Sequence, residues 1–100
     1  HLGVGDDGHT ASWPPGEPEI PGSDRAVELV RMFNGWPRMT LTRSVVNRSR
    51  RRIVLTLGAD KRPMVERWLL LDPSLPITSV RRSDTWVFLD EAAAPNAELR

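Results

Sequence analysis

The sequence predicts an α/β fold in which helices pack on a parallel sheet. Two apolar runs that are rich in β-branched residues, 52–58 and 84–90, are typical of buried strands. Residues 59–71, between them, place their apolar side chains on one helical face, and Pro63 falls in the first turn, where proline is tolerated. A strand, a helix and a second strand in this order form a βαβ unit, which implies a parallel sheet covered by helices.

The first half of the chain has weaker patterns. Residues 38–42 are typical of a strand, and residues 43–50 of a short helix that leads into the next strand. The apolar spacing in residues 24–33 fits a helix better than it fits strand alternation. Residues 13–23 contain four prolines and two glycines, so we expect a loop there.

Composition limits the possible functions. The 100 residues are 39% hydrophobic and 27% charged, which predicts a single globular unit. Fourteen basic and 13 acidic residues give a net charge of +1, too balanced for a general nucleic-acid binder. The chain has no cysteine, so thiolate zinc sites are excluded, and no apolar run reaches membrane-spanning length. Among the tryptophans, we expect Trp68 and Trp86 in the core and Trp13 and Trp36 at loop edges or lining a site.

Four arginines gather in "RSRRR", residues 48–52. Such a cluster either binds a polyanion or is simply solvated, and the second outcome is the commoner one. We expect Arg48, Arg51 and Arg52 to face solvent.

The opening segment "GVGDDG" has glycines at the spacing of a dinucleotide-binding loop. That function needs a helix after the third glycine, whereas here two prolines follow within a few residues. Asp6 and Asp7 would also place two carboxylates where phosphates should lie. We therefore favour a loop that presents His9 over one that binds a nucleotide.

His9 follows Asp7 by two residues and lies among small, flexible ones. A neutral imidazole can accept a proton from water, and Asp7 or Asp6 could fix its tautomer. Glycines allow backbone N–H groups to approach a substrate oxygen closely. Two other interpretations stay open: His9 caps a turn, or it joins Asp6, Asp7 and His1 as a metal ligand.

Several segments together carry a resemblance. "LGVGDDGHTAS", "PRMTLT", "VVNRSRRRIVLTLG", "DKRPMV" and "LPITSVRRSDTWVFLDEAA" resemble successive motifs of the 6-phosphogluconolactonases. The resemblance covers the whole chain but only the C-terminal part of that family. It implies that residues 1–100 are a single partial domain, the C-terminal part of a Rossmann-like parallel-sheet fold whose N-terminal half is missing.

The resemblance also implies an activity: hydrolysis of 6-phospho-D-glucono-1,5-lactone to 6-phosphogluconate in the oxidative pentose phosphate pathway, with no metal and no organic cofactor. In that case His9 is the general base that activates water, and Asp7 holds it in place. Gly5 and Gly8 would contact the substrate at the loop. A cytoplasmic enzyme that binds neither nucleic acid nor membrane is implied, and a homo-oligomer is possible.

The resemblance assigns cations to the phosphate end of the substrate. Lys61 matches the family's phosphate-contacting lysine, while Arg38 and Arg50 match basic positions in two of the motifs. The chain departs from the family at residues 13–16, Trp-Pro-Pro-Gly in place of Leu-Phe-Pro-Gly, and at residues 47–50, where the Asn-Ala-Ala-Arg turn is more polar.

Two alternatives remain beside the lactonase. A glucosamine-6-phosphate isomerase or deaminase would also use a histidine after Asp-Gly, but "TASWPP" lacks the acidic residue that follows in those enzymes. The second alternative is an inactive fragment that acts as a binding unit, with residues 48–52 as its contact to polyanions.

Overall fold

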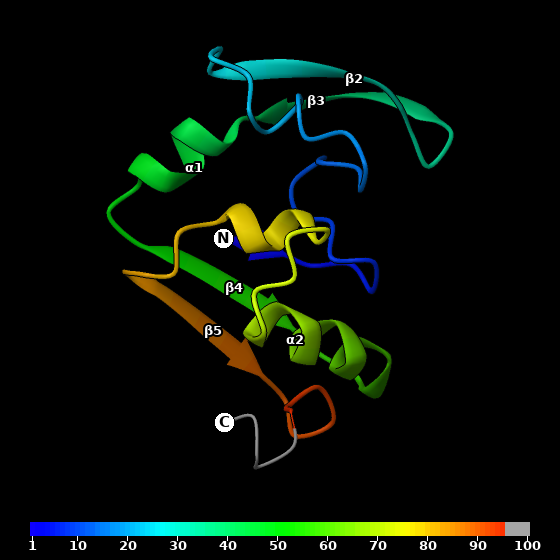
Figure 1. Ribbon diagram of the computed structural model, residues 1–100, viewed down its shortest axis with the longest axis vertical. Coiled ribbons are helices and arrows are strands. Elements are labelled where there is room, and N and C mark those ends of the chain that lie inside the picture. Colours follow the sequence, from blue (N-terminus) through cyan, green and yellow to red (C-terminus); the bar gives the residue numbers. More distant parts are fainter. Residues whose placement is uncertain (96–100) are drawn as a thin grey trace.

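The computed structural model describes residues 1–95, which form two separate sheets and the helices beside them (Figure 1). Strands β1 (Leu2–Gly3), β4 (Arg52–Thr56) and β5 (Thr85–Leu89) form a parallel sheet in the order β1-β4-β5. The predicted α/β class and its βαβ unit are confirmed.

The connection from β4 to β5 contains three short helices. The 3₁₀ helix η1 (Ala59–Lys61) leads into α2 (Arg62–Leu69), and the 3₁₀ helix η2 (Pro76–Ser79) follows. Pro63 lies in the first turn of α2, as predicted. Gly58, with φ of 100°, allows the sharp departure from β4 that a residue with a side chain would resist.

The second sheet is an antiparallel hairpin of β2 (Val27–Phe33) and β3 (Trp36–Leu41), followed by α1 (Arg43–Arg48). The strand predicted at residues 38–42 and the short helix after it are confirmed, but the helix predicted at residues 24–33 is wrong. Asn34 and Gly35, with φ of 50° and 83°, form the two-residue turn that closes a hairpin. This turn chemistry outweighs the helix-like apolar spacing.

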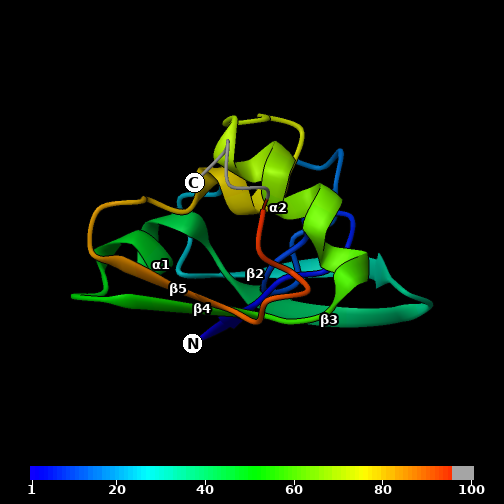
Figure 2. The same cartoon turned by 90° about the horizontal axis from the view of Figure 1, so that it is seen from below.

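The core lies on one face of the parallel sheet. Val54 on β4 and Met64, Val65 and Trp68 on α2 are buried there, so the prediction for Trp68 is confirmed. Figure 2 shows α2 and the segment with η2 over this face. Hydrophobic burial of this kind is the main stabilising contribution of the fold.

The opposite face of the parallel sheet is open, because no element of residues 1–95 packs on it (Figure 2). In the parallel register Ile53 pairs with Trp86 and Leu55 with Phe88, so these side chains share that face. Trp86 is 51% exposed and Phe88 is 48% exposed. The predictions of a buried strand at residues 84–90 and of a core position for Trp86 are therefore wrong.

Of the other two tryptophans, one is buried and one is exposed. Residues 13–23 form successive turns, as predicted, but Trp13 is fully buried and donates its indole N–H to the Leu41 carbonyl at 2.8 Å. This bond ties the loop to the hairpin. Trp36, at the start of β3, is exposed.

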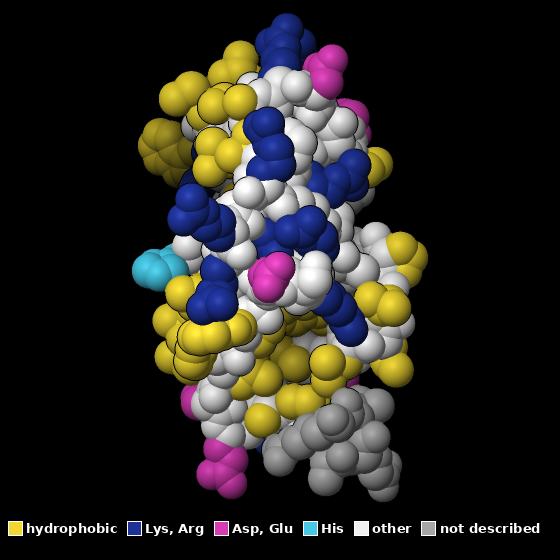
Figure 3. Space-filling view, turned by 90° about the vertical axis from the view of Figure 1, so that its left-hand side faces the viewer, with side chains coloured by type: hydrophobic (Ala, Val, Ile, Leu, Met, Phe, Trp, Pro, Cys, Tyr) yellow, Lys and Arg dark blue, Asp and Glu magenta, His cyan; other side chains and the backbone are white. Residues whose placement is uncertain are grey.

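The arginine cluster also differs from expectation at one position. Lys and Arg side chains gather across the middle of the face in Figure 3, and Arg48 and Arg51 are exposed, with Arg51 4.1 Å above the Trp86 ring. Arg52 is only 3% exposed, so its prediction as solvent-facing is wrong. It points to the covered face of β4 and donates to the carbonyls of Asn47, Ser49 and Ser83 and to the Thr85 hydroxyl.

Candidate active site

The glycine segment forms a tight loop directly after β1. The Gly5 N–H donates to the His9 carbonyl at 2.9 Å, and the Gly8 N–H donates to the Gly5 carbonyl at 3.0 Å. The buried Thr10 hydroxyl donates a hydrogen bond to the Gly3 carbonyl at 2.8 Å. These bonds close the loop and lift His9 above the carboxyl end of the parallel sheet, where ligands of open α/β sheets bind.

Asp7 and His9 form the central pair of the site. The Asp7 carboxylate Oδ1 lies 2.6 Å from His9 Nδ1 and also accepts the His9 backbone N–H at 3.0 Å. Burial alone would raise the pKa of Asp7, but the backbone and side-chain hydrogen bonds from His9 outweigh it and lower that pKa below 3.8. An ionised Asp7 holds the proton at Nδ1, which leaves Nε2 with its lone pair free to act as a base.

The imidazole of His9 is held from two further directions. A Cβ placed on Gly5 would come within 2.2 Å of both Nδ1 and Cε1, so the ring lies directly against the backbone of Gly5. The ring of Phe33, from the hairpin, approaches edge to face with the two centroids 4.9 Å apart. Only a glycine at position 5 leaves room for the ring in this position.

A hollow of about 420 Å³ opens beside this pair, lined by His1, Leu2, Gly3, Val4, Gly5, His9, Ala11 and Lys61. Lys61 reaches it from the end of η1, and its Nζ donates to the Val4 carbonyl at 2.5 Å. An ammonium has three donors, so two remain for an anionic ligand. An imidazole and a cation thus face one hollow of small-molecule size.

The connection between α2 and β5 supports the loop from beneath. Gly8 has φ of 84°, and a Cβ there would come within 2.6 Å of the Leu75 side chain. The Gly8 carbonyl accepts the Ile77 N–H at 3.0 Å. Position 8 therefore requires glycine for two reasons: its backbone conformation and its close contact with this segment.

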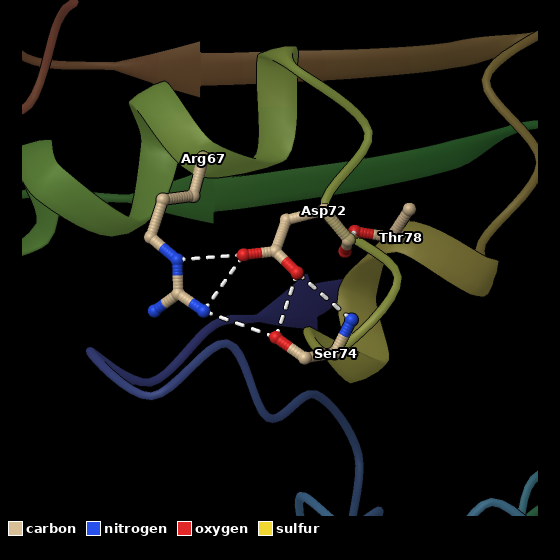
Figure 4. A network of polar contacts seen from close by, with 4 residues as sticks. All are labelled: Arg67, Asp72, Ser74 and Thr78. Atoms are coloured by element: carbon tan, nitrogen blue, oxygen red, sulfur yellow. Dashed lines mark hydrogen bonds and ion pairs between the residues drawn. The ribbon is translucent and has the colours of Figure 1, made fainter.

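A polar network fixes the start of the supporting segment (Figure 4). Asp72 accepts the hydroxyl of Ser74 at 2.7 Å and its N–H at 2.9 Å, and Arg67 donates to Asp72 at 2.8 Å. The Thr78 hydroxyl donates to the Asp72 carbonyl at 2.6 Å. The bonds from Ser74 to the Asp72 carboxylate, above all that of its hydroxyl, and the bond from Arg67 lower the pKa of Asp72 to about 2.

The structure brings some predicted site residues together and separates others. His9, Gly5 and Lys61 meet at the hollow, and Asp7 joins them through its bond to His9. Gly8 contacts Leu75 instead of the hollow, and because the N–H groups of Gly5 and Gly8 both donate within the loop, neither is free for a substrate oxygen.

The two predicted arginines occupy different places. Arg38 lies with its guanidinium carbon 5.5 Å from the centre of the Phe33 ring, so it reaches the surroundings of His9. Arg50 precedes β4, which runs parallel to β1, so Arg50 lies at the opposite edge of the sheet from His9. We do not include Arg50 in the site.

Sequence reasoning missed the long-range partners of the site. Phe33 and Leu75 touch the loop from positions far along the chain, and no local motif distinguishes them. The metal-ligand interpretation finds no support in residues 1–95, where no three histidine, aspartate or glutamate residues gather into a possible metal site. The same residues include no helix long and apolar enough to cross a membrane.

Comparison with known proteins gives consistent matches. Residues 1–89 match the family model described as glucosamine-6-phosphate isomerases/6-phosphogluconolactonase. A 6-phosphogluconolactonase from Synechocystis is 45% identical over 60 residues, 60% of this chain and 25% of that protein. One from Caulobacter vibrioides is 32% identical over 98 residues, 83% of this chain and 38% of that protein.

The fold gives the same result. The crystal structure of 6-phosphogluconolactonase from Thermotoga maritima superposes with a TM-score of 0.73 at 33% identity. That match covers 88% of this chain and 40% of the other. The chain therefore spans about a quarter to two fifths of the length of these relatives.

Proposed function

The chain belongs to the family of glucosamine-6-phosphate isomerases and 6-phosphogluconolactonases, and from this premise we propose that it carries the general base of a 6-phosphogluconolactonase. The proposed reaction is hydrolysis of 6-phospho-D-glucono-1,5-lactone to 6-phosphogluconate in the oxidative pentose phosphate pathway, in the cytoplasm. The observation that carries the proposal is the ionised Asp7 at 2.6 Å from His9 Nδ1, beside a hollow that Lys61 also lines.

The chemistry follows from this pair. His9 Nε2 accepts a proton from water while the water oxygen attacks the lactone carbonyl carbon, which gives a tetrahedral intermediate. The bond between the former carbonyl carbon and the ring oxygen then breaks, and the imidazolium returns the proton to that oxygen. Asp7 stays a carboxylate throughout and stabilises the imidazolium. The step needs no covalent nucleophile. Thr10 has the nearest buried hydroxyl along the chain, and this hydroxyl already donates a hydrogen bond to the Gly3 carbonyl.

The proposed site also has a cation for the phosphate. Lys61 has two donors left after its bond to Val4, and it lies on the same hollow as His9. Arg38, next to Phe33, is the second proposed phosphate contact. Binding the phosphate away from the reacting carbon holds the carbonyl at His9 and so lowers the entropic cost of reaction.

The test is lactone hydrolysis by the full reading frame that encodes this chain. We expect Asp7→Asn and His9→Gln to lower kcat by about 100-fold or more, because general base catalysis contributes roughly that much. Asp6→Asn is the matched control and should keep its activity, since the hydrogen bonds to His9 come from Asp7 and not from this neighbour. We expect Lys61→Met to raise KM.

Two results would overturn the proposal. Wild-type turnover of lactone that survives His9→Gln would remove His9 as the base. Release of ammonia from glucosamine 6-phosphate, without lactone hydrolysis, would assign the protein to the isomerase side of the family.

A further inference from the structure

We propose that Phe33, on the hairpin, is a positioning residue for His9 that fixes the plane of its imidazole. The role rests on the proposed function of His9, but the contact itself is measurable without activity. Phe33 lies in no motif shared with the loop and is 24 residues farther along the chain.

The bond to Asp7 does not by itself orient the imidazole. It fixes the position of Nδ1, but the second side-chain torsion of histidine is broad, so the ring can still tilt about that contact. Gly5 bounds the ring on one side, where a Cβ would approach to 2.2 Å. Phe33 supplies another boundary, with ring centroids 4.9 Å apart and planes inclined by 68°. Three contacts, two from the loop and one from the hairpin, leave Nε2 one direction.

The hairpin is built to turn Phe33 inward. Strict alternation from the buried Val30 would bury Met32, but Met32 is 64% exposed and Phe33 is 8% exposed. The register between β2 and β3 shifts between Val30 and Phe33, and such irregularities re-aim side chains. The bulge therefore directs an aromatic ring to His9 at the cost of regular pairing.

Phe33 is itself firmly held. It belongs to the main hydrophobic cluster, it pairs with Trp36 across the Asn34–Gly35 turn, and the Arg38 guanidinium lies 5.5 Å from its ring centre. A ring held in this way transmits a defined position to its neighbour. The alternative is that Phe33 only fills the core, in which case any buried hairpin residue would matter equally.

The test compares Phe33→Leu with Val30→Ala, a second buried site on the same strand that carries no aromatic ring. Selective labelling of histidine, with a His9→Gln variant that lacks the corresponding peaks, assigns the imidazole signals of His9 by NMR. We expect Phe33→Leu to shift the ring C–H signals of His9, because the ring current of Phe33 is lost, and to lower kcat about tenfold with little change in KM. Val30→Ala should leave both unchanged at a similar loss of stability.

Phe33→Tyr is the conservative variant and should retain the His9 signals and most of the activity. Unchanged His9 signals in Phe33→Leu would overturn the proposal, as would an equal fall of kcat in Val30→Ala. If Phe33→Leu does not fold, Phe33→Tyr decides, because a wild-type His9 spectrum is then expected and a free-histidine spectrum contradicts the contact. Absence of lactonase activity in the wild type would overturn the proposed function, and the NMR comparison would still decide the contact.

Discussion

Substitution of Gly5 by alanine is the most direct test of the geometry around His9. The new Cβ would lie 2.2 Å from Nδ1 and Cε1 of His9 and 2.8 Å from Oδ1 of Asp7. Ordinary contact begins at about 3.4 Å, so the imidazole has to retreat by roughly 1.2 Å. The backbone of Gly5 is outside the left-handed region, so alanine itself is tolerated there.

The expected effect is selective for catalysis. The strain is relieved by moving a partly exposed side chain, so the free energy of unfolding should change by less than about 1 kcal/mol. A displacement near 1 Å at a catalytic group costs about 100-fold, so kcat should fall by that factor, about 2.7 kcal/mol of activation free energy.

The assay measures steady-state lactone hydrolysis, and urea unfolding of the same preparations measures stability. Gly3→Ala is the matched control, because a Cβ at Gly3 meets no atom within 4 Å and should leave most of the activity. Wild-type kcat in Gly5→Ala would refute the reasoning that His9 needs this space. A large loss of stability would show instead that the substitution distorts the loop backbone.

Two further predictions concern stability. Arg52→Met should lower the free energy of unfolding by about 2 kcal/mol, measured by urea denaturation, because it removes the charged, buried donor of the bonds to Asn47, Ser49 and Ser83, while the exposed Arg50→Met should change it little. For Asp72, whose folded pKa of about 2 is below the ordinary 3.8, the stabilisation is complete above the ordinary value and is lost as the pH falls through 2. Unfolding measured across that range should show the wild type's advantage over Asp72→Asn disappear with acid, and a constant difference would contradict the assignment.

Much of the parallel sheet could be predicted from local patterns. The β4, α2 and β5 segments follow from β-branched runs and helical spacing; β4 and α2 each bury one face, whereas no residue of β5 is buried. The pairing of Asp7 with His9 was also accessible, since the two lie two residues apart in one loop. Local sequence determines local contacts.

The errors have two physical causes. At residues 24–33 a helix and a strand both suit the apolar spacing, and the Asn34–Gly35 turn decides for the strand. For Arg52 and Trp86 the residue type predicts the wrong exposure: the arginine is buried and the tryptophan is exposed. Sheet register determines which side of β4 or β5 each side chain occupies. The contact of Phe33 with His9 depends on a bulge and on the packing of two sheets, neither of which a local pattern encodes.

The division into two sheets has a consequence for the response to heat. A two-stranded hairpin has little stability of its own, and its strands form no ladder with the parallel sheet. We therefore expect warming to loosen β2 and β3 before β4 and β5 separate, as a local opening within a folded molecule. His9 would then lose its aromatic neighbour while most of the backbone signal in circular dichroism persists. Loss of the proposed lactonase activity would then precede melting, and it would be reversed on cooling.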